Sequence, residues 1–158
     1  MMMHWLTFFE KGIWFGLAAL GFGILFNVPY RTLLIVYFLG ALGGLLKLLV
    51  IDLGQNIVLA SFAGATLIGI LSVFAARNKH APPLVFAIPS VIPLVPGVLA
   101  YEMMLGLIHL AGSTASENYN QILAKTVNNG LKVFFILMSI SVGVAFPTFV
   151  TGKSSIRA

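Results

Sequence analysis

Five apolar runs constrain this chain more than any other feature of its sequence. A helix needs about 20 residues to cross the hydrocarbon core of a bilayer. The runs cover residues 12–26, 32–51, 57–76, 84–111 and 131–150, and the first extends back to residue 5 if Glu10 and Lys11 lie near the membrane surface. The runs are too continuous for the alternating strands of a membrane β-barrel. We therefore predict an all-α integral membrane protein, with about five transmembrane helices in a single transmembrane domain.

Composition supports the membrane assignment. The chain is 59% hydrophobic and only 8% charged, whereas about 25% of the residues of a soluble domain are charged. The absence of cysteine excludes disulfides, thiol catalysis and cysteine-ligated metals. Lysine and arginine give a net charge of +5, but they stand singly at the ends of apolar runs and form no basic stripe. We therefore expect contact with the lipid bilayer and not with nucleic acid.

The fourth run is interrupted by Pro89, Pro93 and Pro96. Each proline lacks an amide hydrogen and clashes with the carbonyl four residues earlier, so the carbonyls of Val85, Pro89 and Ile92 lose their usual partners. Lipid cannot satisfy these carbonyls, and broken backbone survives in a membrane only where it is buried in protein or lines a wet cavity. Transporters bind substrates at such discontinuous helices. We predict that the fourth helix is broken by its prolines and lines a transport pathway; the alternative is a kink that only packs against other helices.

Polar segments separate the runs. Residues 27–31 stop one helix and start the next, with Pro29 suited to the first helical position. Residues 52–56 form a predicted turn, and residues 77–83 form a predicted basic loop that prolines terminate.

The last helix is predicted to begin before its apolar run. Thr114 and Glu117 fit a capping box, which places the helix start near Ala115. The helix would then carry Asn128 and Asn129 into the membrane. These amides either hydrogen-bond a substrate, join helices to one another, or form a cap near the following glycine.

Charge and small residues give further expectations. One predicted membrane side collects Arg31, Arg77, Lys79, Lys153 and Arg157, and the other collects Lys11, Lys47 and Lys125 among Glu10, Asp52 and Glu117; Lys132 lies just inside the last run. The positive-inside rule then predicts an outside N-terminus and a cytoplasmic C-terminus. Spacings of four residues that allow close helix contact occur at Gly12/Gly16, Gly40/Gly44, Ala65/Gly69 and Ser139/Gly143.

Two motifs resemble the threonine/serine exporter family. One is Gly23-Ile-Leu-Phe-Asn-Val-Pro-Tyr-Arg31, which closes the first run. The other is Val91-Ile-Pro-Leu-Val-Pro-Gly-Val-Leu-Ala-Tyr101, and the last run, ending at Phe146-Pro147, agrees. The resemblance extends over nearly the whole chain, roughly residues 14–149. Its most specific element is a Pro-x-x-Pro-Gly-x-x-x-Tyr run inside a membrane span.

The resemblance implies an architecture and partners. In that family a fused form has about ten spans, and a split form divides them between a larger and a smaller protein; this chain is similar to the smaller one. Fused relatives export threonine and serine, and split bacterial relatives are associated with succinate export. The resemblance thus implies a two-component exporter in the bacterial inner membrane. It would work with a larger membrane subunit on a small carboxylate or amino-acid substrate.

Several side chains are candidates for the pathway. Beside the prolines and Gly97, Ser90 and Tyr101 could supply polar contacts. Glu102, deep in the run, is either a proton-coupling acid or a structural partner of Lys47 or Lys132. His109, two helical turns further on, would continue a proton relay.

Polar residues nearer the predicted membrane surface have two interpretations each. Arg31 is interpreted first as reaching the headgroups. The alternative is that it gathers a carboxylate substrate, and the resemblance, whose motif includes Asn27, Pro29 and Arg31, adds support to this alternative. Lys47 and Asp52 are interpreted as markers of a membrane interface; a substrate contact is the weaker alternative.

Catalysis finds no support in the sequence. The three histidines, His4, His80 and His109, have no mutual metal-ligand spacing, and there is no nucleophile elbow, phosphate loop or dinucleotide fingerprint. We therefore expect no enzyme activity, no metal and no cofactor. The competing hypothesis to an exporter subunit is an accessory membrane protein that stabilises or regulates a partner and touches no substrate. A lipid-modifying enzyme is the least supported.

Overall fold

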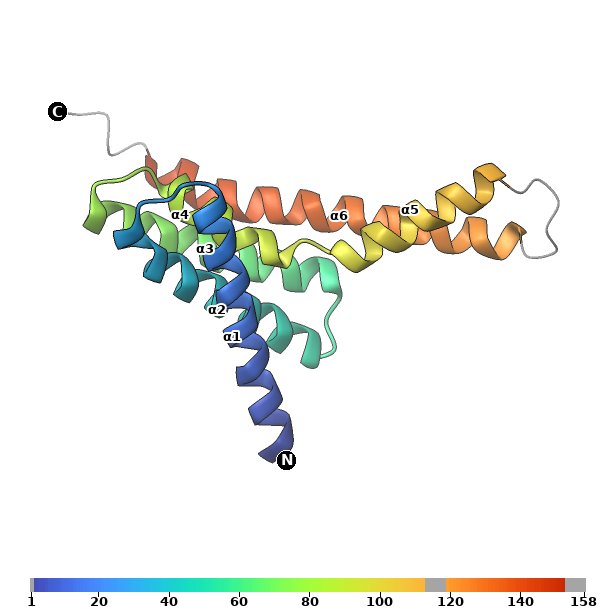
Figure 1. Cartoon of the computed structure of the whole chain (residues 1–158), viewed down its shortest axis with the longest axis horizontal. Helices are drawn as coiled ribbons and strands as arrows, with labels where there is room; N and C mark the ends of the chain where they lie inside the picture. Colours follow the sequence, from blue (N-terminus) through green and yellow to red (C-terminus); the bar gives the residue numbers. More distant parts are fainter. Residues whose placement is uncertain (1, 113–118, 153–158) are drawn as a thin grey trace. The chain divides into compact units, whose positions relative to one another are not determined.

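A computed structural model describes residues 2–112 and 119–152, and side chains within residues 6–112 and 119–150. This described part is helical and contains no strand (Figure 1). Its elements are α1 (Met2–Leu25), α2 (Tyr30–Asp52), α3 (Ile57–Lys79), α4 (Pro83–Val91), the short 3-10 helix η1 (Ile92–Leu94), α5 (Gly97–Gly112) and α6 (Tyr119–Gly152). The predicted all-α fold is confirmed.

The helices account for four or five membrane crossings in the described part of the chain. Four of them, Leu6–Leu25, Tyr30–Asp52, Ile57–Lys79 and Tyr119–Val150, are individually long and apolar enough to cross a bilayer. The bent pair Pro83–Leu94 and Gly97–Gly112 supplies a fifth if it counts as one broken span. The chain is thus a multi-pass membrane protein. The broken span lies in the fourth apolar run, where the prolines predicted it.

Turn chemistry explains where α1 ends and α2 begins. Asn27 adopts a left-handed conformation with φ 56°, which asparagine tolerates better than most residues. The amide of Val28 donates to the carbonyl of Gly23 at 3.0 Å. Pro29 occupies the N-cap of α2 with φ −52°. Pro29 therefore precedes the first helical position and does not occupy it as expected.

The loop predicted at residues 77–83 is shorter than expected. Helix α3 continues through Arg77 and Lys79 and ends at His80, which is left-handed with φ 51°. The amide of Ala81 then donates to the carbonyl of Ala76 at 3.2 Å, closing the helix end. Arg77 and Lys79 lie in the last turn of α3, where basic residues interact favourably with the helix dipole, so their charge stabilises this helix end.

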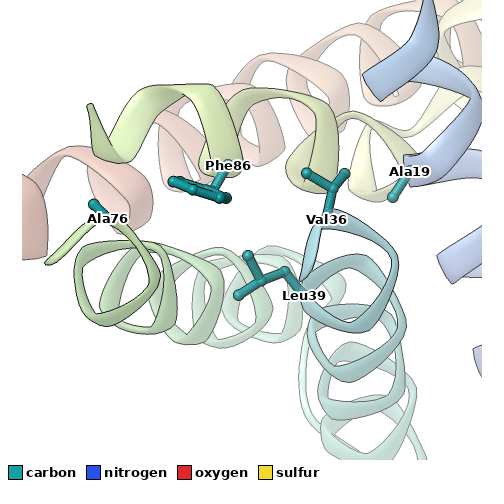
Figure 2. Packing of buried hydrophobic residues seen from close by; sticks show 5 residues of the cluster. All are labelled: Ala19, Val36, Leu39, Ala76 and Phe86. Atoms are coloured by element: carbon teal, nitrogen blue, oxygen red, sulfur yellow. The ribbon is translucent and has the colours of Figure 1, made fainter. Parts of the chain in front are cut away.

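The described residues divide into two compact units, one containing residues up to Leu94 and from Ser139 onward, the other being Val95–Met138. A single transmembrane domain stays a prediction. In the first unit α2 contacts α1, α3 and α4. The core cluster shown in Figure 2 comprises Ala19, Val36, Leu39, Ala76 and Phe86.

Small residues set the helix contacts of the first unit, as predicted. A Cβ atom added to Gly16 would lie 2.7 Å from the ring of Tyr37, and one added to Gly40 would collide with Ala19. A Cβ on Gly69 would lie 3.1 Å from the carbonyl oxygen of Gly143. These glycines therefore let α1 approach α2, and α3 approach the end of α6, at backbone distance.

The second unit pairs α5 with the first part of α6. A Cβ on Gly106 would collide with Thr126, and one on Gly130 would lie 3.1 Å from the sulfur of Met103. Helix α6 passes without interruption through Asn128 and Asn129, so the expected entry of these amides into the span is confirmed and a cap near the following glycine is wrong. The predicted capping box at Thr114 and Glu117, and the helix start near Ala115, lie outside the described residues.

Candidate functional site

The interruption of the fourth span lies near its middle. Helix α4 passes through Pro89, η1 contains Pro93, and α5 begins only at Gly97. Val95 and Pro96 belong to neither helix. The predicted break is confirmed, but the three prolines contribute unequally. A proline disfavours α-helix in the residue before it: α4 continues past Pro89, gives way to the 3-10 helix η1 at Ile92, just before Pro93, and helical backbone ends before Pro96.

Ser90 and Pro89 are buried in α4. The Ser90 Oγ lies 2.7 Å from the carbonyl oxygen of Phe86 in its own helix and 3.2 Å from that of Val36 in α2. The hydroxyl therefore joins α4 to α2. Its described contacts are with protein, so its predicted polar contribution to a pathway stays a prediction.

The side chain of Lys47 donates a hydrogen bond to the interrupted backbone of the fourth span. It is only 8% exposed, and its Nζ donates to the carbonyl oxygen of Leu94 at 2.7 Å. Lys47 is therefore packed inside the first unit, and its place at a membrane interface stays a prediction. The carbonyl that Lys47 contacts is that of Leu94, and not one of the three that the prolines were predicted to free. Leu94 is in the last turn before Val95 and Pro96, where the helical donor four residues on is no longer placed to reach it.

The absence of a side chain at Gly64 gives Lys47 room to lie beside Leu94. A Cβ on Gly64 of α3 would lie 2.6 Å from the carbonyl oxygen of Gly43, 2.9 Å from Leu94 Cδ2 and 3.4 Å from Lys47 Cβ. The sequence did contain a signal for this burial. Val36, Gly40, Gly43 and Lys47 follow the spacing of three and four that lines one helix face, and all of them are buried.

A second buried polar group lies on the facing helix. Ser61 of α3 is fully buried, and its Oγ has no hydrogen-bond partner among the described residues. It precedes Gly64 by three residues, so the two positions share a face of α3. Sequence reasoning missed Ser61, because a lone serine in an apolar run carries no distinctive pattern.

Glu102 belongs to a separate polar cluster, in the second unit. Its Oε2 accepts a hydrogen bond from Asn129 Nδ2 at 3.0 Å and lies 3.3 Å from Lys125 Nζ. The expected structural partners, Lys47 and Lys132, are therefore wrong, because Lys125 is the lysine one turn before Asn129 on α6. His109 is exposed, and its place in a relay stays a prediction.

The other candidates divide by exposure. Arg31 is exposed, donates from Nε to the Tyr30 hydroxyl at 3.0 Å, and lies 5.6 Å from the centre of that ring. Asn27 lines a depression of about 470 Å³ together with Pro89. Other exposed candidates are Gly97, Tyr101 and Asn128.

The family model described as "Threonine/Serine exporter, ThrE" matches residues 11–150. The chain belongs to the threonine/serine exporter family. No solved structure matches it. Membership identifies a membrane exporter, which is a transporter and not an enzyme, and the match covers both the broken span and the Lys47 region.

A further hollow of this exporter lies elsewhere in the first unit. It has a volume of about 950 Å³ and is lined by the end of α3, by α4 and by the last part of α6. Most of the lining is apolar, with Arg77, His80, Ser141 and Thr148 as the polar contributors. None of the predicted site residues lines it, because sequence patterns identified polar residues within spans and this hollow is formed mainly by apolar ones.

Proposed function

We propose that this chain is one subunit of a two-component exporter of small carboxylate-bearing metabolites, working with a larger membrane subunit in the bacterial inner membrane. Its substrate would be a succinate-type dicarboxylate, or threonine and serine. Family membership supports export, and the motifs that resemble the split form support the two-component arrangement.

The observation that carries the proposal is the polar main chain at the broken span. The carbonyl of Leu94 receives a lysine ammonium in place of a helical amide. Interrupted backbone within a bilayer needs protein, water or solute to satisfy it, and exporters place substrates beside such interruptions. A passive anchor needs no such feature.

A partner fits the number of spans. Transporters built from inverted repeats divide their helices into two equivalent sets, and five spans cannot be divided equally. The second set would come from another polypeptide. Alternating access would then move a carboxylate from the cytoplasmic face, past the broken helix, to the outside.

The charges near the helix ends support the proposed orientation. Arg31, Arg77 and Lys79 belong to the predicted cytoplasmic side, whose further members Lys153 and Arg157 lie outside the described residues. Lys47 is buried within α2 and no longer counts toward the opposite side. An outside N-terminus and a cytoplasmic C-terminus therefore agree better with the positive-inside rule.

An accessory scaffold is the second candidate, and one observation favours it. Ser90 and Glu102 already have partners within the chain. Polar groups satisfied in this way hold helices together without any substrate.

Efflux separates the two candidates. The chain and its larger partner are co-expressed, cells are preloaded with succinate, threonine or serine, and efflux is compared for Pro96→Ala, Glu102→Gln and Arg31→Ala. Pro82→Ala, at the exposed N-cap of α4, and Glu10→Gln, exposed on α1, are the matched controls. Membrane abundance is measured for each variant.

We expect Pro96→Ala to reduce efflux most, because it removes the residue that ends the helix, while both controls transport normally. Loss of efflux at normal abundance supports the pathway. Unchanged efflux in all three variants would leave the scaffold as the better explanation.

A further inference from the structure

Lys47 is a buried cation whose described partner is a carbonyl and not an acid. Its ammonium contacts Leu94, and no carboxylate lies within ion-pair distance of it among residues 6–112 and 119–150. The acid nearest in sequence on α2, Asp52, is exposed. Among the described residues, the Lys47 ammonium therefore has the dipole of the Leu94 carbonyl as its partner but no negatively charged group.

Such an arrangement favours an anionic ligand. A charge removed from water is costly unless it is paired and hydrogen-bonded. A lysine ammonium has three donors, and Leu94 accepts from one of them. The remaining donors can bind a carboxylate without displacing the carbonyl of the broken span.

Ser61 is an independent observation that points to a ligand. Its fully buried hydroxyl has no described partner, although buried polar groups are nearly always hydrogen-bonded. It lies one turn from Gly64, where an added Cβ would touch both Lys47 and Leu94. Ser61 thus lies on the face of α3 that packs against Lys47, and a hydroxyl donor and an ammonium together suit the two oxygens of one carboxylate.

We propose that Lys47 and Ser61 form the carboxylate-recognising subsite of this exporter, next to the Leu94 carbonyl. The inference rests on the proposed function and deepens it by naming the residues that select the substrate. The recognised group is either a terminal carboxylate of a dicarboxylate or the α-carboxylate of an amino acid. Lys47 supplies the charge, and Ser61 supplies a neutral donor.

The test uses the complex of this chain with its co-expressed partner, purified in detergent. Its thermal unfolding is followed while succinate, threonine or serine is titrated at constant ionic strength, with succinamide as the neutral analogue. The variants are Lys47→Met, Lys47→Arg and Ser61→Ala. Lys11→Met is the matched control, because Lys11 lies in a candidate span but is exposed.

We expect a saturable rise in Tm with at least one carboxylate and none with succinamide. A rise in Tm with succinate would identify a dicarboxylate as the substrate, and a rise with threonine or serine would identify an amino acid. Lys47→Met should weaken binding by roughly 30-fold or more, the effect of truncating one member of a buried charge pair. Lys47→Arg should retain binding, and Lys11→Met should bind like the unaltered complex.

Ser61→Ala keeps the inference testable if Lys47→Met fails to fold. Removing an unsatisfied hydroxyl should leave the ligand-free Tm unchanged or raised, while losing one hydrogen bond weakens carboxylate binding by about threefold to tenfold. A serine with a purely structural role would not combine an unchanged or raised ligand-free Tm with weaker carboxylate binding.

Three outcomes overturn the inference: carboxylate binding unaffected by Lys47→Met and Ser61→Ala, an equal response to succinamide, or no response of the unaltered complex to any carboxylate. Dissociation of the complex in Lys47→Met, with binding intact in Ser61→Ala, would also overturn it and assign the counter-charge to an acid of the partner. Export of succinate, threonine or serine by the Lys47→Met and Ser61→Ala variants at the unaltered rate would defeat the inference but keep the proposed function. Carboxylate binding that depends on Lys47 and Ser61, without any export, would keep the inference but contradict the proposed function.

Discussion

Lys47 and Glu102 are both charged residues in membrane-crossing helices, yet their surroundings differ. Lys47 is 8% exposed and contacts a backbone carbonyl. The Glu102 side chain is 39% exposed and contacts two side chains, Asn129 and Lys125. In the sequence each is simply a lone charge in an apolar run. The contacts distinguish Glu102, which has an oppositely charged partner in its own unit, from Lys47, which has none among the residues that the structure describes.

This difference reverses the order of importance that the sequence indicates. On sequence grounds Glu102 is the leading candidate for coupling; the structure gives it two partners within its own unit, and a coupling role stays a prediction. The sequence favours an interface role for Lys47, but its burial beside the helix break makes it the stronger functional candidate. Four predictions test this comparison.

The largest effect should come from the packing that surrounds Lys47. We expect Gly64→Ala to lower the free energy of unfolding by about 1–3 kcal/mol, the usual effect of overpacking, because the new methyl would lie 2.6 Å from the Gly43 carbonyl oxygen. Gly21→Ala is the control, since a Cβ there meets nothing within 4 Å. Denaturant unfolding in micelles measures both, and equal stability of the two variants would contradict the described packing.

The two buried serines of the first unit should respond with opposite signs. Ser90→Ala removes a hydroxyl that contacts two carbonyls and should lower the unfolding free energy by about 1 kcal/mol. Ser61→Ala removes a hydroxyl with no partner among the described residues and should leave the unfolding free energy unchanged or raise it. The same unfolding measurement compares them. A loss of stability in Ser61→Ala would show that its hydroxyl has a structural partner.

Adjacent asparagines test the Glu102 side of the comparison. Asn129 is buried and donates to Glu102, whereas Asn128 is exposed. Asn129→Ala should lower the unfolding free energy by about 0.6 kcal/mol, the average for side-chain hydrogen bonds between membrane helices. Asn128→Ala should leave it unchanged. If the exposed residue matters more for stability, the described orientation of α6 is wrong.

The smallest effect is expected at Lys125. This side chain is 71% exposed, and exposed ion pairs contribute little. Lys125→Met should therefore leave both thermal unfolding and efflux within error of the unaltered chain. A clear loss of efflux at normal abundance would return Glu102 and its partners to the transport pathway.

Local chemistry made much of the fold predictable. The lengths of the apolar runs gave the spans, the proline cluster gave the broken helix, and glycine spacings gave close contacts such as that of Gly16 with Tyr37. These features depend on residues near one another in sequence. The extension of α3 through Arg77 and Lys79 was missed because helix ends depend on several weak local terms.

The candidate site was less predictable because it depends on contacts between distant residues. Lys47 and Leu94 are 47 positions apart in the sequence. Only the packing of α2, α3 and η1 shows that the lysine ammonium donates to the Leu94 carbonyl. Glu102 could have met any of several lysines on sequence grounds, and the pairing of α5 with α6 selected Lys125. The lack of a hydrogen-bond partner for the Ser61 hydroxyl in the described part of the chain likewise becomes visible only in three dimensions.

The acceptor for Lys47 has one consequence for how this exporter can change during evolution. Every amino acid carries a carbonyl, so no substitution at position 94 deletes the oxygen that receives the ammonium. Genetic drift can vary the side chain there while the polar contact persists. Loss of the contact by a single point mutation is therefore concentrated at the lysine itself and at the glycines that give it room.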